Sequence, residues 1–339
     1  MQPLPQYSVA IIGGGLAGLA SAILLQQKGY SVALFEKEAY PFHKVCGEYI
    51  SMESWNFLHS LGLPLCDWNL PQIDTLHLTA PNGAQFTTGL PLGGFGVSRY
   101  RLDHALENRA KEVGVHLFVN TRVEEVERGE LFRIRFQNQT VTAKLCLGAW
   151  GKRGNLDVKW KRRFLQQGDT RLNNYIGIKY HVKTDWPQHV IGLHNFEDGY
   201  CGISKIEEDR YCLCYMTRAT NLKRCNNSIQ ELEAQVLFRN RHLQKIFRNS
   251  EVVPGFPVTI SQISFAQKGC VENGVLMLGD TAGMITPLCG NGMSIALHTA
   301  KMAATLGNAF LQEKISQQQL EAQYRAQWQK AFAVRLRMG

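Results

Sequence analysis

The sequence predicts an α/β protein in which a doubly wound, Rossmann-like nucleotide-binding domain is interrupted by an inserted antiparallel β-sheet domain. Two buried strand segments carry this prediction. Residues 8–12 form an apolar run that leads into a glycine-rich turn and a helix, and residues 274–280 form a second run closed by an acid. Short β-like runs lie between these segments, at 175–182, 190–196, 202–206 and 211–215. The nucleotide-binding fold is therefore expected to be discontinuous along the chain.

The first turn has the glycine spacing of a dinucleotide-binding βαβ unit. Gly13 permits the tight turn, Gly15 lets a pyrophosphate approach the backbone, and Gly18 lets the helix pack closely on the strand. The start of the helix adds free N–H groups and the positive end of its dipole. Glu36 ends the next apolar run, about 20 residues further on, where a carboxylate binds a ribose hydroxyl. These features predict binding of the ADP half of a dinucleotide.

Composition narrows the class of protein. The chain has 339 residues, of which 45% are hydrophobic and 19% charged, as expected of a globular protein with two lobes. Its nine cysteines include no C-x-x-C pair and its ten histidines no H-x-x-x-H pair. We therefore expect a reducing, cytoplasmic compartment and no structural metal. The glycine-broken N-terminal run is not typical of a signal peptide, and no run is long and apolar enough to span a bilayer.

The formal charge of +9 is spread along the chain. We interpret it as a solvated surface property and expect no nucleic acid partner. The densest basic run is Lys159, Lys161, Arg162 and Arg163. A solvated loop is the favoured interpretation of this run, and a docking patch for an anionic electron donor is the alternative.

The segments divide into two predicted domains and a tail. Residues 1–66, 97–158 and 266–311 are assigned to the nucleotide-binding domain, and residues 67–96 and 159–265 to a β-rich substrate domain. Within them we expect a hairpin of strands at 75–79 and 85–88 around Pro81-Asn82-Gly83, helices at 54–61 and from about 102, and one helix over 228–247.

The tail, residues 312–339, is predicted to be an amphipathic helix. Its apolar residues recur at every fourth position: Leu320, Tyr324, Trp328, Phe332 and Leu336. A helix packed on its own domain is the favoured interpretation. A helix that contacts a membrane surface or a partner is the alternative.

A second motif distinguishes between dinucleotides. Asp280 closes the buried run, and Gly290, Asn291 and Gly292 precede an alanine-rich helix. A carboxylate at a strand end can accept hydrogen bonds from a polyol, and a Gly-x-Gly turn offers N–H donors to an electron-rich ring edge. A flavin carries a polyol, its ribityl chain, whereas a nicotinamide dinucleotide carries none. The motif therefore favours a flavin.

With both motifs in place, residues 7–304 resemble the flavoprotein superfamily of para-hydroxybenzoate hydroxylase, flavin-dependent halogenases and geranylgeranyl reductases. The resemblance implies an FAD cofactor, with Asp280 on the ribityl chain, Gly290 to Gly292 under the pyrimidine edge and Pro287 on the substrate side. Arg99 matches the arginine of an R-x-x-x-D pattern, with Asp103, that contacts the cofactor. The alternatives are a helix N-cap for Asp280 and a plain salt bridge for Arg99. Members usually continue past residue 339, which implies a truncated chain unless Gly339 is a natural C-cap.

Departures from the family patterns narrow the chemistry. Hydroxylases carry an Asp-Gly pair where this chain has Trp150-Gly151, which argues against tight NAD(P)H binding. The W-x-W-x-I-P signature of the halogenases is absent. The segment from Lys44 to Glu48 instead looks like the K-x-C-G-[DE] loop of geranylgeranyl reductases, which lies beside the flavin. Lys44 is therefore counted among the cofactor-binding residues.

Cys46 and His43 are the candidate catalytic residues. Cys46 is either a redox-active or proton-donating thiol activated by neighbouring Lys44, or a packed loop cysteine. His43 is either a proton donor or a polar loop residue. Tyr200 and Cys289 are expected to line the substrate site, with packing as the alternative role of Tyr200.

The sequence thus predicts an FAD-dependent oxidoreductase acting on an apolar small molecule. Reduction or dehydrogenation of a carbon–carbon bond, as in geranylgeranyl reductases, is favoured by the Cys46 loop. The alternatives are monooxygenation with NAD(P)H and oxygen, and a non-catalytic flavin electron carrier. A single G-x-G-x-x-G turn predicts that NAD(P)H binds only transiently or that another donor is used. No particular oligomeric state is predicted.

Overall fold

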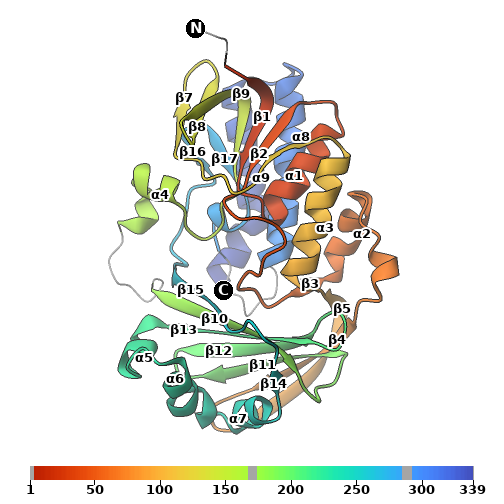
Figure 1. Ribbon diagram of the computed structural model, residues 1–339, viewed down its shortest axis with the longest axis vertical. Helices are drawn as coiled ribbons and strands as arrows, with labels where there is room; N and C mark the ends of the chain where they lie inside the picture. Colours follow the sequence, from red (N-terminus) through yellow and green to blue (C-terminus); the bar gives the residue numbers. More distant parts are fainter. Residues whose placement is uncertain (1–3, 167–173, 285–291, 339) are drawn as a thin grey trace.

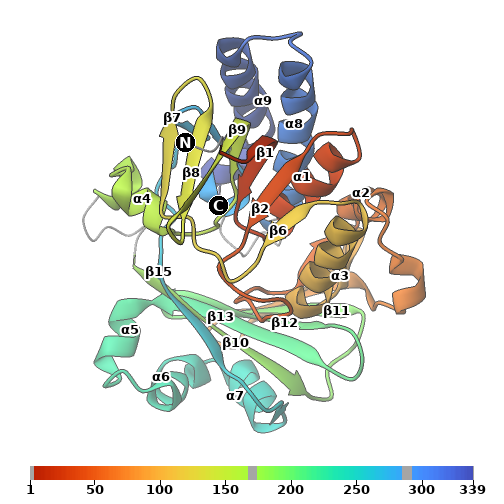
Figure 2. The same ribbon diagram turned by 45° about the horizontal axis from the view of Figure 1, so that its top comes forward.

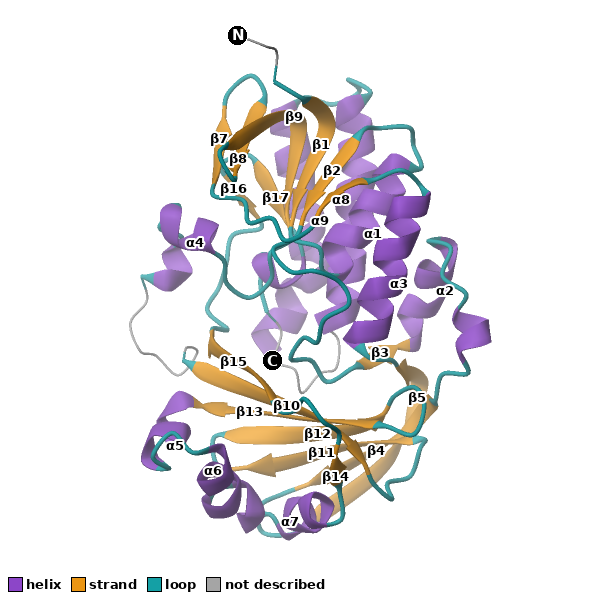
Figure 3. Ribbon diagram, in the orientation of Figure 1, coloured by secondary structure: helices purple, strands orange, loops and turns teal. Residues whose placement is uncertain are grey.

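The computed structural model describes residues 4–166, 174–284 and 292–338. Two β-sheets form separate layers, with long helices beside the first sheet and short helices on the outer face of the second (Figure 1). Figure 3 shows the same two layers coloured by element type. The predicted α/β fold class, with a nucleotide-binding sheet and a largely antiparallel second sheet, is confirmed.

The first sheet is doubly wound. Its strands run in the order β16-β17-β9-β1-β2-β6, with parallel pairing from β17 to β6. From β1 the chain adds strands on one side and later returns to the other, so the order reverses between β1 and β9, which is where such sheets bind ligands. The strands are β1 (Gln6–Ile12), β2 (Val32–Phe35), β6 (His116–Phe118), β7 (Glu125–Arg128), β8 (Phe132–Phe136), β9 (Gln139–Gly148), β16 (Val271–Glu272) and β17 (Val275–Met277).

Six helices accompany this sheet within the described residues. Leu19, Ile23 and Leu25 of the first helix are fully buried, because its glycine-rich start brings it close to the sheet. Figure 2 shows the last two helices packed side by side. The helices are α1 (Leu16–Gln26), α2 (Trp55–Ser60), α3 (Arg99–Glu112), α4 (Asn155–Lys159), α8 (Gly292–Leu311) and α9 (Gln317–Met338).

The second sheet has the strand order β14-β10-β13-β12-β11-β4-β5-β3, and β15 also pairs with β10. Its pairs are antiparallel except for β4 with β11. The β4–β5 hairpin is the predicted one, and β5 also pairs with β3, which comes from the segment assigned above to the first domain. The elements are β3 (Tyr49–Ser51), β4 (Gln72–Thr79), β5 (Gln85–Gly96), β10 (Tyr175–Lys183), β11 (Val190–Phe196), β12 (Gly199–Lys205), β13 (Tyr211–Arg218), β14 (Glu251–Val252), β15 (Val258–Ile263), α5 (Ala219–Arg224), α6 (Ile229–Gln235) and α7 (Arg241–Arg248).

Two helix predictions are corrected. The single helix expected over 228–247 is split into α6 and α7, because Asn240 begins a new helix by accepting a hydrogen bond from the His242 N–H. The Asn240 amide also donates to Thr79 and to the carbonyl of Asn195, so buried tertiary bonds hold it out of a continuous helix. The helix expected from about residue 102 begins at Arg99, since the Ser98 hydroxyl caps it.

The C-terminal helix α9 buries its apolar stripe inside the protein. Leu320, Tyr324, Trp328 and Phe332 are all buried, and the Tyr324 hydroxyl donates to the carbonyl of Met277 at 2.7 Å. The helix is thus packed on its own domain, as the favoured interpretation predicts. Among the helices of the described segments, none is both long and apolar enough to cross a membrane.

Candidate functional site

The glycine-rich turn lies at the carboxyl end of β1, where the strand order reverses. Gly13 has a φ of 106°, and a Cβ on Gly18 would overlap the Gly13 carbonyl oxygen, so α1 packs tightly on the turn. Gly15 differs, because an added Cβ would meet only Nζ of Lys44 at 3.6 Å and Nη2 of Arg99 at 3.7 Å. The N-terminus of α1 is therefore open toward two cationic side chains.

Both cations share the carboxylate of Asp103. Nε and Nη2 of Arg99 donate to it at 2.7 and 2.8 Å, and Nζ of Lys44 lies 3.0 Å away. Burial opposes ionisation, but the ion pairs raise the pKa of Arg99 and lower the pKa of Asp103. Two positive charges against one negative leave a net positive charge facing Gly15. The salt bridge of Arg99 is thus compatible with binding an anionic pyrophosphate.

Glu36 lies at the end of β2 beside the same turn. Its side chain is buried, with one oxygen accepting from the Gly14 N–H at 2.8 Å and the other from the Glu38 N–H at 3.1 Å. The Tyr40 hydroxyl donates to the Gly14 carbonyl. A carboxylate has about four acceptor positions, so Glu36 retains capacity for a ribose hydroxyl.

Asp280 follows β17 in a short 3-10 turn whose N-cap is Leu278, so it is not a helix N-cap. Nζ of Lys268 donates to the Asp280 carbonyl at 2.8 Å and to the Lys152 carbonyl at 2.7 Å. Burial lowers the pKa of Lys268 to about 8, and the nearby negative charge of Asp280 raises it only in part. These contacts hold the turn through its backbone and do not use the Asp280 carboxylate.

Arg162 fixes the chain on the other side of this turn. Its Nη1 donates to Asp157 at 2.8 Å and to the Thr281 carbonyl at 3.0 Å, and the Arg162 and Asp157 side chains are each 1% exposed. Asp157 also accepts from Nε1 of Trp150 at 3.0 Å. The basic run at 159–163 is exposed at positions 159, 161 and 163, as expected of a solvated loop. Arg162 is the exception, because it is buried with a carboxylate.

Four predicted site residues lie outside the described residues: Pro287, Cys289, Gly290 and Asn291. Gly292, the last residue of the predicted Gly290-Asn291-Gly292 turn, is the first residue of α8. The next residue, Met293, places its sulfur 3.6 Å from the sulfur of Cys46. The start of α8 and the Cys46 loop are thus neighbours, although 247 positions separate the two sulfurs in sequence.

The loop from Lys44 to Glu48 is held by side chains from other elements. Lys152 donates to the Val45 carbonyl at 3.2 Å, and the Cys212 thiol and Ser204 hydroxyl donate to the next two carbonyls, each at 3.2 Å. The Cys46 thiol itself donates to the Met293 sulfur. Lys44, which the sequence predicts to activate Cys46, pairs with Asp103 in the structure.

Glu48 ends this loop in a fully buried charge cluster. Nζ of Lys179 and Nε2 of His181 lie 2.7 and 2.6 Å from its two oxygens, and the Arg99 N–H donates to it at 2.8 Å. Burial alone would raise the pKa of Glu48, but Lys179 and His181 lower it to about 2. The ionised carboxylate only accepts, so Nε2 of His181 donates. Sequence reasoning missed both β10 residues; the available signal was a Lys and a His two positions apart on an otherwise apolar strand.

Three side chains of metal-ligating type meet at this cluster. The donor atoms of Glu48, His181 and Cys212 lie within 4.8 Å of one another. Lys179 already neutralises Glu48, and the Cys212 thiol donates to a backbone carbonyl. A divalent cation would lie beside the buried ammonium group, so this chemistry is that of an ion-pair cluster rather than a metal centre.

His43 lines a cavity of about 720 Å³ between α3 and the second sheet, where His181 of β10 also lines it. Its ring stacks on Tyr100 at 4.7 Å and contacts Phe256 at 4.8 Å. Burial, followed by the charge of Lys179, lowers the pKa of His43 to about 4. The imidazole is therefore neutral at pH 7, and a role as proton donor stays a prediction.

An apolar cluster lies on the face of the second sheet beside the Cys46 loop. Met216, Ile263 and Met284 are buried, and Tyr200 packs against them as a partly buried neighbour. A Cβ added to Gly177 of β10 would lie 3.0–3.4 Å from side-chain atoms of Val45, Ile260 and Ile263, so these three side chains surround the same point. The Cys46 loop and this cluster therefore adjoin.

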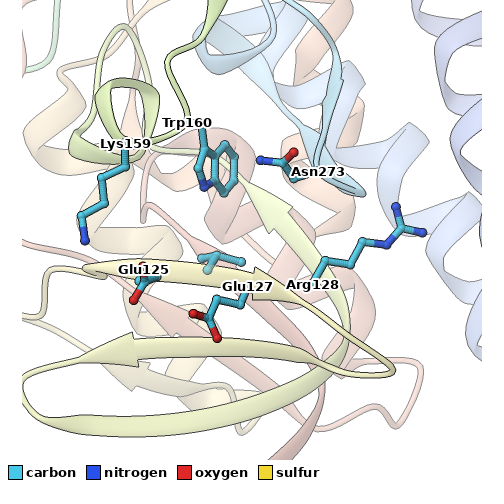
Figure 4. Close-up of a pocket in the computed structure, with 7 residues that line it drawn as sticks. Glu125, Glu127, Arg128, Lys159, Trp160 and Asn273 are labelled. Atoms are coloured by element: carbon cyan, nitrogen blue, oxygen red, sulfur yellow. The ribbon is translucent and has the colours of Figure 1, made fainter.

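A separate cleft of about 590 Å³ lies between β7, α4 and the β16–β17 turn (Figure 4). Its lining mixes carboxylates, cations and a tryptophan, and includes none of the predicted site residues: Glu125, Val126, Glu127, Arg128, Lys159, Trp160 and Asn273.

Comparisons with known proteins identify the family of this chain. The family model described as FAD binding domain matches residues 6–331. Digeranylgeranylglycerophospholipid reductase 1 of Methanopyrus kandleri is 22% identical over 350 residues, covering 96% of this chain and 87% of that protein. Conditioned medium factor receptor 1 of Dictyostelium discoideum is 25% identical over 366 residues, covering 96% of this chain and 68% of that protein.

Solved structures share the fold at low sequence identity. A flavin-dependent brominase superposes with a TM-score of 0.80 at 20% identity, covering 95% of this chain and 85% of the other. A geranylgeranyl bacteriochlorophyll reductase-like protein from Thermoplasma acidophilum superposes with a TM-score of 0.76 at 18% identity, covering 98% and 86%.

Proposed function

This chain belongs to the family of FAD-binding domains and is an FAD-dependent oxidoreductase, and on that premise we propose that it reduces a carbon–carbon double bond of an apolar, isoprenoid-like substrate. The observation that carries the proposal is the apolar cluster of Met216, Ile263 and Met284 beside the Cys46 loop. The relative from Methanopyrus kandleri, named as a reductase of a geranylgeranyl lipid, supports the choice of substrate class.

The chain's own residues fit the cofactor. The open face of Gly15 between Lys44 and Arg99 suits the pyrophosphate, Glu36 suits the ribose, and Asp280 suits the ribityl chain. When bound and reduced, FAD supplies two electrons as a hydride equivalent. The adjacent cluster of thioether, isoleucine and aromatic side chains excludes water and holds the hydrocarbon.

Cys46 is the proposed proton donor. Reduction adds a hydride equivalent to one carbon of the double bond and a proton to the other, so a group beside the substrate must supply that proton. Cys46 lies next to Met293 at the start of α8, and its thiol donates to the Met293 sulfur, which orients it. Either NAD(P)H binds only transiently as the electron donor or another donor is used, since the chain has a single G-x-G-x-x-G turn.

Replacement of Cys46 tests this assignment. Cys46→Ser should retain FAD and slow substrate reduction about 100-fold, the usual scale for a lost acid–base group. Cys66→Ser, at an exposed cysteine, is the matched control and should leave the rate unchanged. Equal rates for Cys46→Ser and wild type would assign Cys46 to packing.

Product analysis separates reduction from monooxygenation. Mass spectrometry of the product formed from geranylgeraniol should show the gain of two hydrogen atoms. A product that has gained an oxygen atom, formed only in air, would instead favour the monooxygenase.

A further inference from the structure

We infer that Lys179 and His181, on strand β10 of the second sheet, are positioning residues that hold Cys46 in place by binding Glu48. The inference rests on the proposed function only in giving Cys46 a chemical task. The contacts that carry it do not depend on the substrate.

The loop that carries Cys46 is fixed largely by its neighbours. Its residues lie outside regular helix or strand up to Glu48, and its carbonyls accept hydrogen bonds from Lys152, Cys212 and Ser204. Glu48 has a φ of 56°, a left-handed conformation that is unfavourable for a residue with a Cβ. Interactions of the Glu48 side chain must offset that backbone cost.

Those interactions come from the second sheet. The side chains of Glu48 and Lys179 are each 0% exposed and that of His181 is 1% exposed, so water cannot replace the partners. A buried carboxylate without its cation is strongly unfavourable, as is a buried ammonium group without its anion. The Glu48 side chain is therefore held against β10, and this contact fixes the end of the Cys46 loop as well.

The same carboxylate connects the loop to the proposed pyrophosphate site. Glu48 accepts from the backbone N–H of Arg99, whose guanidinium binds Asp103 and faces Gly15. Lys179 and His181 thus stabilise one arrangement in which Cys46 and Arg99 keep fixed positions.

Alkylation of Cys46 in the FAD-bound protein tests the inference without any substrate. Peptide mass mapping after iodoacetamide treatment gives the labelling rate of Cys46, with exposed Cys66 as an internal reference. Lys179→Met should raise the Cys46 rate at least about tenfold, the factor that corresponds to about 1.4 kcal/mol of loop stability. The Cys66 rate should stay the same, and Lys183→Met, on an exposed residue of the same strand, should change neither rate.

A double variant separates positioning from folding. Lys179→Met leaves the buried Glu48 carboxylate without its ammonium partner and should lower the melting temperature. The double variant Glu48→Gln with Lys179→Met leaves no unpaired charge and should recover most of the lost melting temperature. Cys46 should nevertheless stay rapidly labelled in the double variant, because the loop has lost its tie to β10. His181→Gln, which leaves no unpaired charge, serves if Lys179→Met does not fold, and should also raise the Cys46 rate.

An unchanged Cys46 rate in the folded variants would overturn the inference. If the wild-type protein does not reduce the substrate but Cys46 is labelled fast in the folded variants, the proposed function is overturned and the positioning role stands.

Discussion

Alanine at Gly15 should separate cofactor binding from folding. Gly15 has a φ of −83°, which alanine adopts freely, and its Cβ would lie in ordinary contact with Lys44 and Arg99, at 3.6 and 3.7 Å. The stability of the apoprotein should therefore change by no more than about 1 kcal/mol. The added methyl group lies where the pyrophosphate must approach. Loss of one charge-assisted hydrogen bond, about 1.5–3 kcal/mol, weakens FAD binding roughly 10- to 150-fold.

Gly18→Ala is the matched comparison. Its Cβ would overlap the Gly13 carbonyl oxygen, so the strand–helix turn itself must open. This variant should lose about 1–3 kcal/mol of stability or more, together with FAD. Urea unfolding of the apoproteins and quenching of FAD fluorescence on titration give the two quantities. The reasoning is refuted if Gly15→Ala binds FAD within threefold of wild type, or if its apoprotein is as destabilised as that of Gly18→Ala.

Three further predictions concern separate parts of the fold. Asp280→Ala should weaken FAD binding by about 1–3 kcal/mol, measured by titration, and leave the melting of the apoprotein unchanged, because Lys268 holds the Asp280 backbone. Arg162→Met should lower the unfolding free energy in urea by about 3–5 kcal/mol, since it leaves a buried carboxylate unpaired, whereas exposed Arg163→Met should have little effect. Burial lowers the pKa of His194 to about 3, whereas its unfolded value is 6.5. Protonation in the unfolded state therefore opposes folding below pH 6.5, and the wild type should lose up to about 2 kcal/mol of its unfolding free energy between pH 7 and pH 5 through this residue. Urea unfolding of His194→Gln should show that much less loss, and equal losses would mean that His194 does not titrate on unfolding.

Local sequence signals were sufficient for the first sheet and its turn. The glycine spacing from Gly13 to Gly18 encodes backbone contacts that no other residue permits, so it specified a strand, a turn and a helix together. The β4–β5 hairpin followed from its Pro-Asn-Gly turn in the same way.

Features that depend on distant partners were not predictable in this way. Asn240 interrupts a helical pattern because it bonds Thr79, 161 positions away in the chain. Glu48 was recognised as part of a loop motif, but its partners on β10 lie 131 and 133 positions further on. Arg162 resembled its solvated neighbours until the fold placed Asp157 and Thr281 around it. Such contacts leave no periodic pattern near the residue concerned.

Anaerobic stopped-flow absorbance tests the central claim most directly. The FAD-bound protein is reduced with dithionite under nitrogen and mixed with geranylgeraniol, and the return of oxidised-flavin absorbance is followed. The account predicts substrate-dependent reoxidation without oxygen, slowed in Cys46→Ser and unchanged in Cys66→Ser. Reoxidation that requires oxygen whatever alkene is offered would contradict it.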